Sequence, residues 1–95
     1  MTKDEAPPAG EERLPAIDFS TFILSLSTSA LYHLGLMADP ETGKPGPKNL
    51  ALARQTVDTL EILQQKTRGN LEPEEARLLE NLLFELRLRC VESAK

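Results

Sequence analysis

An uncharged stretch of twenty residues, from Phe19 to Ala38, constrains the fold of this chain more than any other feature. Twelve of its residues are apolar and six are Ser or Thr, whereas Asp, Glu, Lys and Arg make up 27% of the whole sequence. Asp18 is a favoured N-cap, and the apolar residues that follow recur at helical spacing, so the pattern predicts a helix over about 18–38. The face expected to meet the core comprises Phe19, Phe22, Ile23, Leu26, Ala30, Leu34 and Met37.

Two further helices are predicted after this one. Apolar residues recur at helical spacing over about 48–68, and Gly69 suits the position just beyond a helix end. Pro73 suits the first position of a third helix, over about 73–92. Because the link between these two helices is short, the sequence predicts that they form an antiparallel hairpin. No strand-like alternation is present in the sequence, and the expected fold is all-α.

Composition limits the class of protein. A chain of 95 residues permits one domain, predicted here over 17–93, and the proline-rich and charge-rich residues 1–16 are expected to form a disordered tail. The net charge of −4, with scattered basic residues, argues against nucleic-acid binding. The single Cys90 excludes an internal disulfide, and the N-terminus lacks the apolar core of a signal peptide. A cytoplasmic location is therefore expected.

The first and third predicted helices carry more apolar residues than one core-facing stripe requires. Phe84, Leu88 and Val91 are spaced i, i+4, i+7 opposite the leucine-rich face of the third helix. Leu24 and Leu31 stand one heptad apart on the first helix, outside its main apolar face. Burying one such side chain is worth roughly 1.5–3 kcal/mol, and contiguous exposed apolar patches mark interfaces. We therefore expect these residues to pair with a second copy in a homo-oligomeric bundle, the alternative being that they are isolated surface residues.

The segment 38–47, with the sequence ADPETGKPGP, is predicted to be a connection between helices. It is not a phosphate-binding loop, because a proline follows its Gly-Lys pair and no strand precedes it. Exposed loops often carry function. Asp39, Glu41 and Lys44 are therefore candidate contacts with a partner protein.

The sequence offers little material for catalysis. His33 is the only histidine and Cys90 the only cysteine, so no acid, base and nucleophile can be assembled, and neither an enzyme nor a bound cofactor or metal is expected. A ligand-binding or metal-binding bundle that uses these two residues is one alternative, although a four-ligand zinc site would need two chains. Membrane association through residues 19–38 is the other alternative, weakened by six hydroxyl groups and the lack of basic anchors.

Four segments carry a family resemblance and occur in a characteristic order. They are FSTFILSLSTSALYHLGL at 19–36, DPETGKP at 39–45, NLALARQTVDTLEILQQKTRGNL at 49–71 and LLENLLFELRLRCVE at 78–92. Together they resemble a bacterial family of small uncharacterised proteins catalogued as domain of unknown function 1844, over roughly residues 16–93. The resemblance implies a small, stand-alone helical bacterial protein and brings no activity, substrate or catalytic residue. The sequence thus favours a self-associating structural or protein-interaction module without catalytic activity.

Overall fold

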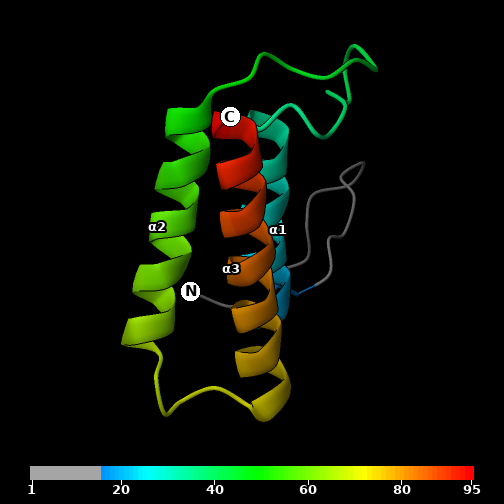
Figure 1. The fold of residues 1–95 in the computed structure, drawn as a ribbon. Helices are drawn as coiled ribbons and strands as arrows, with labels where there is room; N and C mark the ends of the chain where they lie inside the picture. Colours follow the sequence, from blue (N-terminus) through cyan, green and yellow to red (C-terminus); the bar gives the residue numbers. More distant parts are fainter. Residues whose placement is uncertain (1–15) are drawn as a thin grey trace, which may run out of the picture.

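Three helices pack around one core in the computed structural model, which describes residues 16–95 (Figure 1). They are α1 (Phe19–His33), α2 (Leu50–Lys66) and α3 (Pro73–Ala94), and each helix contacts the other two. No strand forms within this described range, which contains one isolated antiparallel bridge in the loop between α1 and α2. The predictions of an all-α fold and of three helices are confirmed. The predicted tail, apart from its last residue, lies outside the described residues.

Side chains at the helix starts account for where each helix begins. Oδ1 of Asp18 accepts a hydrogen bond from the backbone N of Thr21 at 2.8 Å, as expected of an N-cap. Asn49 caps α2 in the same way, so that helix starts slightly later than predicted. At the start of α3, Glu72 and Glu75 form a reciprocal capping box just before and within the first turn.

The first helix ends at His33, five residues before the predicted end. Gly35 adopts a left-handed conformation with φ of +76°, and the backbone N of Leu36 donates to the carbonyl of Leu31 at 2.9 Å. This arrangement is a Schellman motif, in which a glycine satisfies the last helical carbonyls and turns the chain away. Met37, predicted on the core face of the helix, is consequently outside it and 38% exposed.

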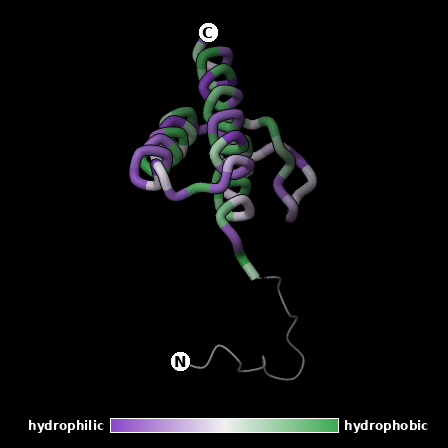
Figure 2. Tube along the Cα trace, turned by 90° about the horizontal axis from the view of Figure 1, so that it is seen from below, coloured by the Kyte–Doolittle hydropathy of each residue, from purple (hydrophilic) through white to green (hydrophobic). Residues whose placement is uncertain are grey.

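The core lies where the three helices meet and is built from aliphatic side chains and one cysteine. In Figure 2, hydrophobic and hydrophilic positions recur in bands along α2 and α3, as amphipathic helices require. Phe22 was predicted to face the core but is 39% exposed, whereas Ser27 is buried in line with Ile23 and Ala30. The buried apolar residues are Ile23, Ala30, Leu34, Ala53, Val57, Leu60, Leu79, Leu83, Leu86 and Cys90.

Candidate functional site

The outer face of α3, defined here as Phe84, Leu88 and Val91, is the main apolar surface that the predicted site residues form. Their side chains are 69%, 44% and 56% exposed. Their spacing along the helix places them on the side opposite Leu83 and Leu86, which are almost fully buried. The three residues therefore form a stripe that the helices of this subunit leave uncovered.

The two predicted interface residues of α1 behave differently from each other. Leu24 is 45% exposed, as an interface residue of a separated subunit would be. Leu31 is half-buried and packs against the core, contrary to its expected position outside the core-facing surface. Its burial depends on how α1 packs against α2 and α3, which the spacing of apolar residues within α1 does not determine.

Charged side chains around the outer face of α3 are paired within the subunit. Both Nε and Nη2 of Arg87 donate to the carboxylate of Glu61 on α2. Arg89 pairs with Glu85 at 2.9 Å and with Glu92 at 3.5 Å along α3. Such exposed pairs add little stability. For the site, they mean that both arginines beside the apolar stripe are neutralised by carboxylates of the same subunit.

The loop between α1 and α2 contains a turn closed by its own hydrogen bonds. The backbone N of Asp39 donates to the carbonyl of Lys44 at 2.7 Å, and that of Gly43 donates to the carbonyl of Asp39 at 2.7 Å. Oδ1 of Asp39 accepts from the backbone N of Glu41 at 2.8 Å. Of the three predicted partner contacts, Glu41 and Lys44 are exposed and Asp39 is half-buried. Asp39 thus holds the turn that presents the other two.

Tyr32 attaches this turn to the end of α1, and the sequence analysis gave it no such role. Its Oη donates to Oδ2 of Asp39 at 3.3 Å. Its ring lies against Gly46, where an added Cβ would come within 2.5 Å of the phenol carbon and oxygen. The negative charge of Asp39, followed by desolvation, raises the pKa of Tyr32 above its usual value. The single glycine between two prolines in the loop was the sequence signal that a side chain passes close by.

A family model described as "Domain of unknown function (DUF1844)" matches residues 16–92. The chain belongs to this family. The DUF1844 match includes α1, α2 and most of α3, together with the loop held by Tyr32, and it confirms the family resemblance seen in the sequence. No curated protein and no solved structure matches the chain.

The remaining reactive residues of this DUF1844 chain lie in separate structural settings. His33 is half-buried at the end of α1, with the centroid of its ring 5.5 Å from that of the Tyr32 ring. Cys90 is buried on α3, and this burial raises the pKa of its thiol. Between residues 16 and 95, no group of three or more His, Cys, Asp or Glu side chains could hold a metal ion.

Length and hydropathy decide whether a helix can cross a bilayer. A membrane-spanning helix needs about 20 predominantly apolar residues. None of the helices in the described part of the chain is both long and apolar enough to cross a membrane.

Proposed function

We propose that this DUF1844 chain is a self-associating helical module that acts as a structural or protein-interaction unit and catalyses no reaction. In this proposal α2 and α3 form an antiparallel hairpin that presents the outer face of α3 to a second copy. The observation that carries the proposal is the exposure of Phe84, Leu88 and Val91 in one stripe. Fully burying each of these side chains would add roughly 1.5–3 kcal/mol of stability, and a lone subunit lacks this contribution.

Charge supports a second copy as the occupant of this face. Arg87 and Arg89 are each paired with carboxylates of the same subunit, so they offer no unpaired charge to a highly charged partner. Two identical faces of this kind meet without strong like-charge repulsion. A two-fold dimer, in which the same patch is used twice, is the commonest arrangement of this type.

The size of the face indicates that α1 takes part as well. The stripe from Phe84 to Val91 spans about 10 Å along the helix axis. A stable interface buries about 800 Å² on each partner, which is more than three side chains supply. Leu24, exposed on α1, is the predicted interface residue that extends the contact.

Substitution of one side chain in the stripe tests the proposal. Phe84→Glu introduces a charge at its most exposed position and should shift the assembly to the monomer mass of 10.5 kDa in sedimentation velocity. Ile62→Glu is the matched control, because Ile62 is a large apolar residue that is 56% exposed, compared with 69% for Phe84, but lies on α2 and outside the stripe. If Phe84→Glu sediments like the wild type, the outer face of α3 is not the interface.

A second contact surface is proposed at the loop, where Glu41 and Lys44 stand on the turn closed by Asp39. Because hydrogen bonds within the chain already order this turn, a partner protein would lose little conformational entropy from it on binding. The variant with Glu41→Ala and Lys44→Ala should lose a binding partner that the wild type captures, while its oligomer mass stays unchanged. Loss of the oligomer in that variant would instead place the loop in the self-association interface.

We further propose a cytoplasmic location for the chain. Its single cysteine, Cys90, is a free thiol, as is usual in a reducing compartment. Fractionation of the native host tests this proposal, which recovery in the membrane or secreted fraction would contradict.

A further inference from the structure

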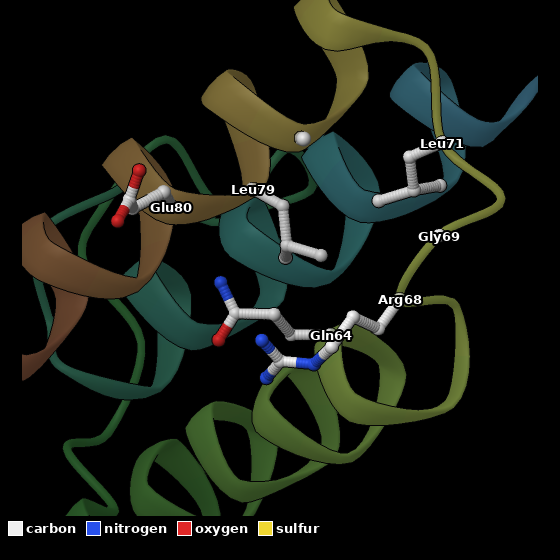
Figure 3. A pocket seen from close by; sticks show the side chains of 7 residues that line it. Gln64, Arg68, Gly69, Leu71, Leu79 and Glu80 are labelled. Atoms are coloured by element: carbon white, nitrogen blue, oxygen red, sulfur yellow. The ribbon is translucent and has the colours of Figure 1, made fainter.

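A hollow of about 340 Å³ lies at the end of the bundle where α2 leads into α3 (Figure 3). Its volume falls within the range of small-molecule sites, about 300–1,000 Å³. It shares no residue with the outer face of α3 or with the loop after α1. Its lining comes from the last turn of α2, the link and the first turns of α3, and includes Gln64, Arg68, Leu71, Ala76, Leu79 and Glu80.

The lining divides into an apolar floor and a polar wall. Leu71 is half-buried, with its side chain directed toward the hollow (Figure 3), whereas Leu79 lines the hollow but is fully buried. Leu71 and the exposed Ala76 therefore supply the apolar surface that a ligand can reach. Gln64 and Arg68 extend their polar ends beneath Leu79 from the α2 side (Figure 3). An aliphatic chain can therefore contact leucine while a polar group at its end reaches an amide and a guanidinium.

The link borders this hollow at a glycine. Gly69, which also lines it, has a left-handed φ of +88°, and a Cβ added there would meet nothing within 4 Å. The backbone at Gly69 therefore lines the hollow without a side chain.

We infer that this hollow binds a small aliphatic monocarboxylate. The planar guanidinium of Arg68 presents paired N–H donors that match the two oxygens of a carboxylate. The amide of Gln64 supplies a further N–H donor. Leu71 and Ala76 receive the aliphatic chain, because burial of its CH₂ groups against apolar side chains is favourable.

Glu80 restricts the class of ligand. It is exposed at the edge of the hollow, where its negative charge repels any anion. Arg68 offsets this repulsion more readily for a single carboxylate than for the two charges of a phosphate or a dicarboxylate. The same carboxylate would attract an ammonium group. Aliphatic amino acids are therefore one source of the proposed monocarboxylate, and short fatty acids are the other.

Amide chemical shifts in ¹H–¹⁵N spectra of the full chain test the inference, with hexanoate as the probe added to about 10 mM, ten times a millimolar Kd. Saturable shifts are expected at Gln64, Gly69 and Leu71. Arg68→Gln should weaken binding about tenfold or more, because it removes the charged donor. Lys66→Gln is the matched control, since it removes one positive charge from the same helix end at a residue that does not line the hollow. The absence of saturable shifts, or equal weakening by both variants, would overturn the inference.

Further probes and variants show whether the carboxylate is the group that is bound and whether an amino acid or a fatty acid supplies it. Hexanol or hexylamine binding as tightly as hexanoate would overturn the role of the carboxylate. Leucine binding more tightly than hexanoate would support an amino acid as the source, and the reverse order would support a fatty acid. Ala76→Leu should block hexanoate by filling the hollow, whereas Ala51→Leu, on an exposed position of α2, should not. Retained binding in Ala76→Leu contradicts the assigned location.

Discussion

Gly46→Ala is predicted to destabilise the protein through one side chain, Tyr32. An alanine Cβ at this position would lie 2.5 Å from the phenol carbon and oxygen, far inside contact distance. The backbone of Gly46 itself is not in the left-handed region, so the added methyl group is the whole perturbation. The tyrosine ring can turn aside, and it then loses its hydrogen bond to Asp39, worth about 1 kcal/mol, and its packing against the loop, worth about as much.

The expected loss for Gly46→Ala is therefore about 1–2 kcal/mol in the free energy of unfolding. Urea denaturation followed by circular dichroism measures it, with all variants at one protein concentration so that any association is held constant. In a thermal scan, each kcal/mol lowers Tm by about 4–8 °C for a domain of this size.

A double-mutant cycle isolates the contact. In the background of Tyr32→Ala the ring is absent, and Gly46→Ala should then cost less than about 0.5 kcal/mol. If Gly46→Ala has the same cost in both backgrounds, the steric explanation is wrong.

Three further predictions concern the core and two titrating groups. Leu83→Ala should lower the free energy of unfolding by about 2–5 kcal/mol in urea, because Leu83 is 1% exposed in the core. Hydrogen bonds from the backbone and hydroxyl of Thr21 lower the pKa of Asp18 below 3.8 in the folded protein. The stability that these bonds add is present above the pKa of Asp18 in the unfolded chain, and it is lost as pH falls through the pKa in the folded protein. Asp18→Asn, which still caps the helix, should therefore flatten the acid limb of stability against pH, measured by urea unfolding between pH 5 and pH 2. The negative charge of Asp39 raises the pKa of Tyr32 above 10.0 in the folded protein. The stability that neutral Tyr32 contributes is therefore complete below the pKa of the unfolded chain and is lost as pH rises through the pKa of the folded protein. Tyr32→Phe should remove this loss of stability, measured by urea unfolding above pH 9.

Each of these predictions has a result that contradicts it. For the core, an equal loss in Leu52→Ala, a residue 40% exposed on α2, would show that burial does not set the cost. For the acid limb, an unchanged slope in Asp18→Asn would place the titrating group elsewhere. If the free energy of unfolding declines equally above pH 9 in Tyr32→Phe, groups other than Tyr32 cause the decline.

Local signals predicted the helix starts well, because caps act within a few residues. Asp18 and Pro73 each marked a start that the structure confirms. The end of α1 was missed because Gly35 stands in an unbroken uncharged run, and hydropathy alone does not show where a left-handed glycine turns the chain. Apolar periodicity placed Met37 in a helix that had already ended.

Contacts between distant segments were less readable from the sequence. No residue near Leu31 in the sequence indicates that Leu31 packs on the core, because its burial depends on how α1 packs against the other helices. The hollow around Arg68 likewise arises from the path of the link between α2 and α3. Phe84, Leu88 and Val91 were readable as a surplus stripe because their spacing within one helix determines the side on which they lie.

Sedimentation equilibrium of the full chain, over about a hundredfold range of concentration, tests self-association most directly. We expect a mass that rises with concentration to a multiple of 10.5 kDa. A mass of 10.5 kDa at every concentration would contradict it and would leave the outer face of α3 as solvent-exposed surface.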